Sequence, residues 1–257
     1  MGLIPLVYNS DMTLSIRLLP FATADGPSNM AADEALLESA SSRGVATLRF
    51  YTWTEPTLSL GYFQPAAVRE SPSDLAGLSW VRRSTGGAAI VHHHELTYAL
   101  ALPAGKEWVS SEPWVCRFHH ILRDVLAHFG IRAHAVICGE ERQLGEVLCF
   151  LHQTPGDLLI EGSKVAGSAQ RKWKGAMLQH GSLLLRRSDF APMLPGINDA
   201  AGHERFSPEE LADLLTWRFA SATGWEVESG DWTAEELARI PAIRAEKYAH
   251  REWNGKR

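Results

Sequence analysis

Runs of strand-forming residues and separately capped helices follow one another along this chain in an irregular order. The run Thr47–Trp53 is rich in β-branched and aromatic residues, which is typical of a strand, whereas residues 114–129 repeat apolar side chains at helical spacing. Ser207 begins a capping box ahead of a helix over Pro208–Thr223. A doubly wound fold would need regular alternation of strand and helix. This order therefore predicts an α+β fold with a mixed, mostly antiparallel sheet flanked by helices.

The remaining elements are predicted from the same signals. We expect a helix over residues 30–41 that is capped by Ser28 or Asn29 and ended by Gly44, and another over 233–246 that is capped by Thr233. Strands are expected over residues 13–21, 57–62, 78–83, 95–102, 147–150, 158–161, 164–170 and 181–185.

Composition narrows the class of protein. With 257 residues, 45% of them hydrophobic, the chain can bury a sizeable core, and its net charge of −5 does not favour nucleic acid or a membrane surface. No apolar run is long enough to span a membrane. Three scattered cysteines match neither a zinc site nor a disulfide framework, and residues 1–11 do not look like a signal peptide. We therefore expect a cytoplasmic protein.

The first chemical motif joins two arginines to a run of small residues over positions 82–89. Small residues let backbone N–H groups approach a ligand closely, and Arg82 and Arg83 add positive charge, which suits a phosphate or a carboxylate. No Gly-Lys-Ser/Thr follows, so the run is not a Walker A loop. A tight turn between strands with solvated arginines is the alternative.

The second motif surrounds Lys164, which Gly167 and Ser168 follow after three and four residues. A lysine in such a setting can hold a carboxylate or polarise an acyl carbonyl, although a surface lysine on a hairpin is the alternative. Cys149 lies 15 residues earlier, a separation that a hairpin could close, and a nearby lysine would favour its thiolate. The alternative for Cys149 is a small buried hydrophobic residue.

Histidines form the third set of candidates. Gln179 and His180 precede Gly181 in a strand-like run and could line a pocket. The three adjacent histidines at 92–94 would point to alternate faces of a strand and could not all face one ion. We therefore predict no metal site here.

Taken together, these stretches resemble the lipoate-protein ligase and octanoyltransferase family, from near the N-terminus to the end of the chain. Three motifs in the right order are far more specific than any one of them. The matching segments are residues 29–35, 56–61, 82–87 continuing through 91–92 to 95–98, 164–170, 178–181 and 252–254.

The resemblance implies the α+β fold shared with biotin ligases and class II aminoacyl-tRNA synthetases. It also implies an acyl tunnel beside the glycine loop, with Lys164 touching the acyl carboxyl or carbonyl group. Ala88 stands where many members have a third glycine, and His93 and His94 replace residues that are often acidic. We expect one catalytic domain over residues 13–257, without the accessory C-terminal domain of the long ligases. The implied substrate-binding residues are Arg83, Gly86, Gly87, Ala88, His92, Gly167, Ser168, Ala169, Gln179 and His180.

Two activities of the family remain open. Cys149 looks like the nucleophile of the cysteine-type octanoyltransferases, with Lys164 as its catalytic partner. Such an enzyme takes octanoyl from acyl carrier protein through a thioester to a lysine of a lipoyl-domain or glycine-cleavage protein, without a cofactor. Asp157 resembles the aspartate of the ATP-dependent ligases, which would use ATP and Mg, but Gly156 replaces their asparagine. A non-catalytic acyl-binding module is the third possibility.

Two further expectations follow from the transferase hypothesis. The acceptor lysine must lose a proton before it attacks, and either His92 or His180 could relay that proton. The protein partners are expected to be acidic, so we predict that they dock on basic patches and that docking weakens with salt. The patch residues are Arg82, Arg83, Arg171, Lys172 and Lys174.

Overall fold

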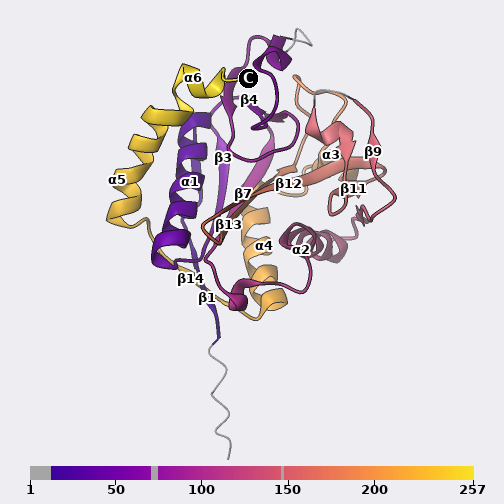
Figure 1. Cartoon of the computed structure of the whole chain (residues 1–257). Helices are drawn as coiled ribbons and strands as arrows, with labels where there is room; N and C mark the ends of the chain where they lie inside the picture. The colour runs from indigo at the N-terminus through magenta and orange to yellow at the C-terminus, as the bar shows by residue number, and fades with distance from the viewer. Residues whose placement is uncertain (1–12, 71–74, 146–147) are drawn as a thin grey trace, which may run out of the picture.

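A computed structural model describes residues 13–70, 75–145 and 148–257 of the chain. A large sheet forms its centre (Figure 1). Its strands are β1 (Ser15–Leu18), β2 (Ala22–Ala24), β3 (Thr47–Trp53), β7 (Glu95–Leu102), β8 (His134–Ala135), β11 (Leu158–Ile160), β12 (Ser163–Trp173), β13 (Ala176–Leu184) and β14 (Glu226–Ser229).

The strand order is β14-β1-β3-β7-β13-β12-β11-β8, and β2 also pairs with β3. Every neighbouring pair from β3 to β8 is antiparallel, whereas β14, β1 and β2 join through parallel pairs. The predicted mixed, mostly antiparallel sheet is therefore confirmed.

A second, three-stranded sheet holds the small-residue loop. It consists of β4 (Thr57–Leu60), β5 (Ser79–Arg82) and β6 (Ile90–His92), in the order β5-β4-β6. The loop leaves this sheet at the end of β5 and re-enters it at the start of β6, so both of its ends are anchored. A short pair of β9 (Arg142–Gln143) and β10 (His152–Gln153) lies near η4 (Cys149–Leu151) in the sequence.

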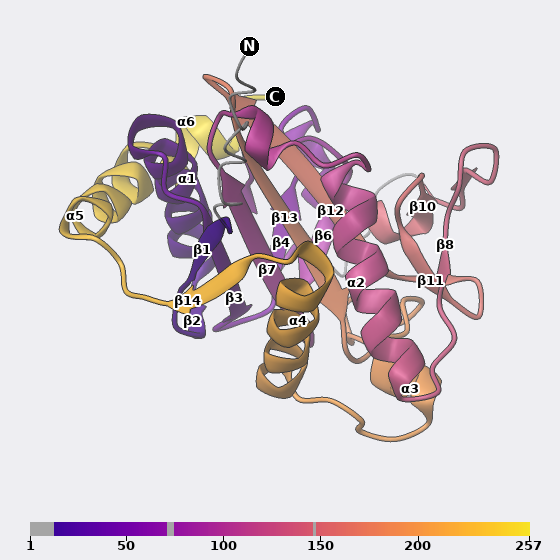
Figure 2. The same cartoon turned by 90° about the horizontal axis from the view of Figure 1, so that it is seen from below.

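Helices cover both faces of the large sheet. Helices α1 (Gly26–Arg43) and α5 (Ala234–Ile243) lie on one face, and α2 (Trp114–His128) and α4 (Pro208–Thr223) lie on the other (Figure 2). The expected arrangement of one domain with a sheet between helices is confirmed. The shorter elements are η1 (Ala66–Glu70), η3 (Lys106–Trp108), α3 (Ile197–Ala201), η5 (Arg244–Tyr248) and α6 (Arg251–Asn254).

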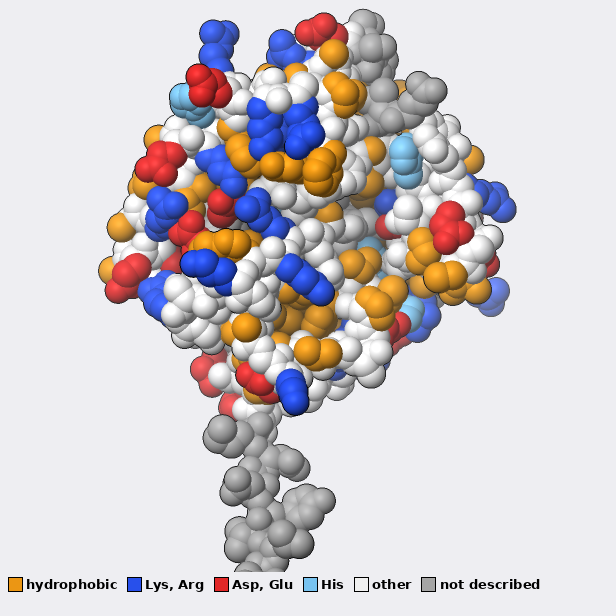
Figure 3. All heavy atoms as spheres, in the orientation of Figure 1, with side chains coloured by type: hydrophobic (Ala, Val, Ile, Leu, Met, Phe, Trp, Pro, Cys, Tyr) orange, Lys and Arg blue, Asp and Glu red, His pale blue; other side chains and the backbone are white. Residues whose placement is uncertain are grey.

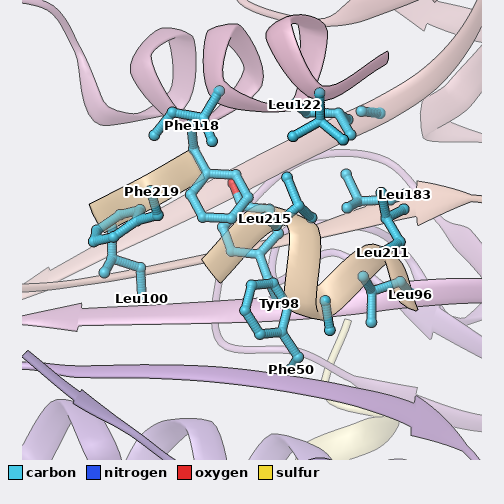
Figure 4. Close-up of a cluster of buried hydrophobic side chains, with 14 of the residues drawn as sticks. Phe50, Leu96, Tyr98, Leu100, Phe118, Leu122, Leu183, Leu211, Leu215 and Phe219 are labelled. Carbon is cyan, nitrogen blue, oxygen red and sulfur yellow. The ribbon is translucent and has the colours of Figure 1, made fainter. Parts of the chain in front are cut away.

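The central strand β7 divides the core into two layers. Its side chains alternate between the faces, so Leu96 and Tyr98 join the cluster under α2 and α4, where Tyr98 stacks on Phe118 at 3.6 Å (Figure 4). Ala99 and Ala101 face α1 instead, and their small size lets that helix lie close to the sheet. By the same alternation, Glu95 and Thr97 point to the α1 side, where the pocket described below opens.

Several predicted boundaries need correction. Helix α1 begins at Gly26, because the side chain of Asp25, rather than Ser28 or Asn29, caps it by accepting from the Ser28 N–H at 2.8 Å. The strand expected over residues 147–150 is wrong, since η4 occupies Cys149–Leu151 and Val147 lies outside the described residues. The helix expected over 233–246 ends at Ile243 and continues as a wider π turn.

Other short elements escaped prediction. Strand β14 has only four residues and one apolar β-branched side chain, so its pairing with β1 supplies what its own sequence lacks. Residues 13–21 form only the four-residue β1, with β2 following. Within the described ranges, no helix is long and apolar enough to cross a membrane. The expectation about a signal peptide concerns residues 1–11, which lie outside those ranges.

Candidate active site

A pocket lies between α1, the small-residue loop and strands β12 and β13. The empty space within it, together with the solvent at its open mouth, is about 440 Å³. Three of the predicted motifs contribute to its wall. The lining residues are Met30, Tyr51, Ser59, Arg83, Gly87, Ile90, His92, Thr97, Cys149, Gly167, Ser168, Ala169, His180, Gly181 and Ser182.

Arg83 holds the small-residue loop through hydrogen bonds to its backbone. Its side chain is buried, and its Nη2 donates to the backbone carbonyls of Gly86 at 2.7 Å and Ala88 at 2.8 Å, while Nη1 donates to Ser59 at 3.0 Å. Burial lowers the pKa of Arg83 to about 10, which still leaves it cationic at neutral pH. The alternative of a solvated arginine is therefore wrong, and most of its donors hold the loop in shape.

Arg82 is also buried, and it joins β5 to the C-terminal helix. Its backbone N–H and its Nε donate to the side chain and the backbone carbonyl of Asn254 at 2.8 and 2.9 Å. The indole of Trp253 donates to the Arg82 carbonyl at 2.8 Å. The segment 252–254 thus supports the strand that leads into the loop, which gives this motif a structural role.

Lys164 is buried beside Cys149, only 3% exposed. Its Nζ lies 2.7 Å from Asp157 Oδ2, 3.0 Å from the carbonyl of His152 and 3.9 Å from Cys149 Sγ. The proximity predicted from the 15-residue separation is confirmed, and the alternative of a surface lysine on a hairpin is wrong. The buried ammonium is compensated by Asp157, to which the sequence assigned only a ligase role.

Gly167 makes room for the lysine. A Cβ atom at this position would lie 2.5 Å from Lys164 Cε and 2.9 Å from its Nζ, closer than atoms pack. The absence of a side chain at Gly167 therefore leaves the space that the Lys164 ammonium occupies.

Cys149, the first residue of η4, contacts the small-residue loop. Its backbone N–H donates to the carbonyl of Ala89 at 2.6 Å, and its Sγ lies 3.9 Å from where a Cβ on Gly87 would stand. It is partly exposed, so the alternative of a fully buried cysteine is wrong. Cys116 and Cys138 do not line the pocket, and burial raises the pKa of Cys116, which disfavours its thiolate.

His180 pairs with an aspartate that the sequence did not single out. Its Nδ1 lies 2.9 Å from Asp33 Oδ2, and its Nε2 lies 2.7 Å from the hydroxyl of Thr85. Asp33 is buried on α1, where Arg49 and Tyr51 also donate to it. Asp33 lies within the segment 29–35 that resembles the family, which was its only signal in the sequence. Its burial and its polar contacts become visible only in the structure.

A second buried pair joins His92 to Glu95. Their Nδ1 and Oε1 atoms are 2.7 Å apart, and the His92 ring stacks on Trp53 at 3.8 Å. Only His92 belongs to a strand, because His93 and His94 form the turn between β6 and β7 and stack on each other. The premise that all three histidines alternate along a strand is therefore wrong.

Not all of the predicted binding residues reach the pocket. Gly86 and Ala88 belong to the loop without lining the pocket, and they present their carbonyls to Arg83. Gln179 points to the opposite face of the sheet, where it donates to Tyr98 and accepts from Gln170. The structure therefore gathers most of the predicted residues in one pocket beside Cys149, whereas Gly86, Ala88 and Gln179 do not line it. Lys164 contacts Cys149 without lining the pocket itself.

The predicted basic patch also changes. Arg82 and Arg83 are buried and cannot meet a partner protein, whereas Lys172 and Lys174 are exposed at the turn between β12 and β13. Near the C-terminus, Lys256 lies over the ring of Trp253 at 3.7 Å, and Lys and Arg side chains gather beside hydrophobic ones on this face (Figure 3). An exposed cationic surface is therefore available without the two arginines.

Comparison with protein families gives a match over most of the chain. The model described as the lipoyl protein ligase A/B catalytic domain matches residues 25–205. The octanoyltransferase LipM of Brevibacillus brevis is 34% identical over 89% of this chain and 94% of its own length. The octanoyltransferase LipM of Bacillus subtilis is 30% identical over 94% of this chain and 98% of its own length.

Solved structures share the fold. Lipoate-protein ligase A bound with ATP superposes with a TM-score of 0.77 at 21% identity, covering 94% of this chain and 99% of that chain. Protein Ta0514 of T. acidophilum with bound lipoic acid superposes with a TM-score of 0.76 at 22% identity, covering 95% and 100%. At this level of identity the likeness concerns the fold alone.

Proposed function

Because this chain belongs to the lipoyl protein ligase A/B catalytic domain family, we propose that it is an octanoyltransferase. Its relatives named octanoyltransferase LipM, at 30–34% identity over about nine-tenths of the chain, support octanoyl transfer. The donor is octanoyl-acyl carrier protein, and the acceptor is a lysine of a lipoyl-domain or glycine-cleavage protein. Residues 13–257 act as the catalytic domain.

One observation carries this proposal. Lys164 Nζ lies 3.9 Å from Sγ of Cys149, which lines the pocket. A free thiol has a pKa of about 8.5, so few molecules are ionised at neutral pH without help. The ammonium favours the thiolate that attacks the incoming thioester. The C–S bond to the carrier breaks as the new one forms, and the exchange needs no ATP because a thioester replaces a thioester.

The same lysine then faces the oxygen on which negative charge develops. The backbone N–H groups of Gly86 and Gly87 are candidate co-donors to that oxyanion, held by Arg83 from beneath. The acyl chain extends into the pocket along Gly167, Ser168 and Ala169 of β12 and past His92 and His180. An acyl chain suits this pocket, because most of its wall is made of backbone, small and apolar side chains.

The ATP-dependent lipoate ligase is the second candidate, and the position of Asp157 favours it. Asp157 is buried at the site, as an aspartate that helps with a metal and phosphate would be. Its Oδ2, however, already accepts from Lys164 and from the N–H of Thr154 at 2.7 Å. A ligase would need ATP and Mg, and a non-catalytic acyl-binding module would show no turnover with either set of substrates.

Intact-protein mass spectrometry after mixing with octanoyl-acyl carrier protein, without ATP, tests the proposal. Wild type should gain one octanoyl mass. Cys149→Ser should lose this adduct, and Cys116→Ser and Cys138→Ser should keep it. Two results would contradict the transferase hypothesis and favour the ATP-dependent ligase. One is a wild type that never gains the octanoyl mass, and the other is a Cys149→Ser variant that stays fully active with ATP and free lipoate.

A further inference from the structure

Two histidines line the pocket, each paired with a buried carboxylate, and the two pairs differ in their hydrogen bonds. His92 pairs with Glu95, and His180 pairs with Asp33. We propose that the Glu95–His92 pair is the general base of the second half-reaction, with His92 Nε2 taking the proton of the acceptor lysine. This inference rests on the proposed function, because the base acts on an acyl group already held by Cys149.

The tautomer of His92 follows from its neighbours. The indole N–H of Trp53 can only donate, and it donates to Thr97 Oγ1 at 2.9 Å. The hydroxyl proton of Thr97 is therefore free to go to Glu95 Oε1, which accepts it. The Ser182 hydroxyl donates to the same oxygen at 3.0 Å. An ionised carboxylate can only accept, so His92 Nδ1, 2.7 Å from Oε1, donates to it and carries the ring proton. In the neutral ring the lone pair is then on Nε2.

The tautomer of His180 follows in the same way and is the same, but its Nε2 has a hydrogen-bond partner. Burial raises the pKa of Tyr51 well above its ordinary value, so its hydroxyl remains protonated and donates to Asp33 Oδ2. His180 Nδ1 donates to the same oxygen at 2.9 Å, which leaves the lone pair on Nε2. That lone pair accepts the hydroxyl of Thr85 at 2.7 Å. His180 is thus already engaged at both nitrogens.

His92 is held ready for proton transfer. Its ring stacks on Trp53 with an interplanar angle of 11°, and it lines the same pocket as Cys149. Across the described residues, Nε2 forms no hydrogen bond and the buried Glu95 Oε2 has no donor. A carboxylate so poorly solvated stabilises a neighbouring imidazolium, since the positive charge compensates a negative one that water does not reach.

The step balances as a transfer from sulfur to nitrogen. The neutral amine of the acceptor lysine attacks the thioester carbonyl carbon, and one N–H proton passes to His92 Nε2 as the C–N bond forms. The C–S bond then breaks, and its electron pair stays on Cys149 Sγ. The imidazolium returns its proton to that sulfur, which restores the thiol and the neutral histidine and leaves the amide on the acceptor.

The experiment separates the two half-reactions. Octanoyl-Cys149 enzyme is formed from octanoyl-acyl carrier protein, isolated, and mixed with a lipoyl domain or with hydroxylamine. Hydroxylamine is a strong nucleophile but a weak base, so its addition product can lose its proton to water without help from the protein. In His92→Gln, transfer to the lipoyl domain should slow by about 10²- to 10⁴-fold, as is usual for loss of a general base. Acylation of Cys149 and cleavage by hydroxylamine should slow much less than transfer to the lipoyl domain, because neither needs a proton to pass to His92.

Two further variants complete the test. Glu95→Gln should show the same selective loss with a smaller factor, because Glu95 acts through His92 and is a positioning residue. His94→Gln changes a neighbouring histidine of the turn and should behave as wild type in all three assays. Transfer by His92→Gln at the wild-type rate would overturn the inference, as would equal losses in all three reactions. A wild-type chain that never acquires the octanoyl mass would instead overturn the proposed function and this inference with it.

Discussion

The variant Gly167→Ala tests whether the position of Lys164 governs acylation of Cys149. The added Cβ would stand 2.5 Å from Lys164 Cε, and the side chain must retreat by about 0.9 Å to reach an ordinary 3.4 Å contact. Lys164 lies in a buried ion pair with Asp157 at 2.7 Å, so it cannot yield without disturbing that pair. The substitution changes neither charge nor chemistry and moves only the ammonium.

Two estimates bracket the effect on rate. With an effective dielectric constant of about 20, an ammonium and a thiolate at 3.9 Å attract by about 4 kcal/mol, and lengthening that distance by the full shift would cost about 0.8 kcal/mol, or roughly fourfold. Misplacing a catalytic group by about 1 Å can cost about 100-fold through geometry. We therefore expect acylation to slow by roughly 4- to 100-fold, and stability to fall by about 1–3 kcal/mol from overpacking.

Rapid-quench mass spectrometry of octanoyl transfer from the carrier protein measures the rate, and thermal unfolding measures stability. Gly77→Ala is the matched control, since a Cβ there meets nothing within 4 Å. An acylation rate for Gly167→Ala within twofold of the control would refute the reasoning, because Lys164 could then move without consequence.

Three other predictions concern the pocket, the surface and the core. Burial of about seven acyl carbons at about 0.8 kcal/mol per methylene should supply roughly 5 kcal/mol before entropic losses, so octanoyl carrier protein should turn over much faster than acetyl or butyryl forms. Joint Lys172→Glu and Lys174→Glu changes should weaken binding of both protein partners and reduce its dependence on salt, as binding titrations at two ionic strengths would show. Burial lowers the pKa of His119 to about 4 in the folded protein, against about 6.5 in the unfolded chain. The unfolded state therefore binds the proton first, and stability should fall by up to roughly 3 kcal/mol between pH of about 6.5 and about 4, a slope that His119→Gln should flatten in denaturant titrations.

For each of these three predictions, one result would contradict it. Equal turnover of acetyl and octanoyl carrier proteins would exclude a fitted acyl pocket. Partner affinity that is flat from low to high salt in wild type would exclude electrostatic docking. Unfolding free energies with the same acid dependence in wild type and His119→Gln would mean that another group causes the loss.

Much of the fold was predictable wherever local sequence decides local structure. Strands β3 and β7 have the predicted bounds, because β-branched, aromatic and apolar residues dominate both runs. Helix α4 also matches, since its Ser207 capping box and the Gly224 after its last turn act within a few residues. In contrast, β14 is a strand because β1 pairs with it. Next to η4, the described residues form only an isolated bridge between Ala89 and Leu148, which does not continue as a ladder.

The residues of the candidate site differ in the same way: some could be proposed from local sequence, and others meet only in the folded chain. Cys149 and Lys164 could be proposed from residue type and spacing, because a nucleophile and a cation 15 residues apart can be joined by local chain reversal. Asp33 could not be connected to His180, since the two lie 147 residues apart and meet only through packing of α1 on the sheet. Glu95 likewise gains its contact with Ser182 only because β7 pairs with β13.

The sequence by itself determined the elements whose signals are local and the family, and it suggested the two residues that we propose for the chemistry. Only the tertiary structure decided which charges are buried and which are free. Arg83 and Lys164 look like surface cations in the sequence, yet backbone carbonyls from the loop and the carboxylate of Asp157 compensate them in the interior. A charge can leave water only where partners replace its hydration, and those partners are supplied by segments that the fold brings together.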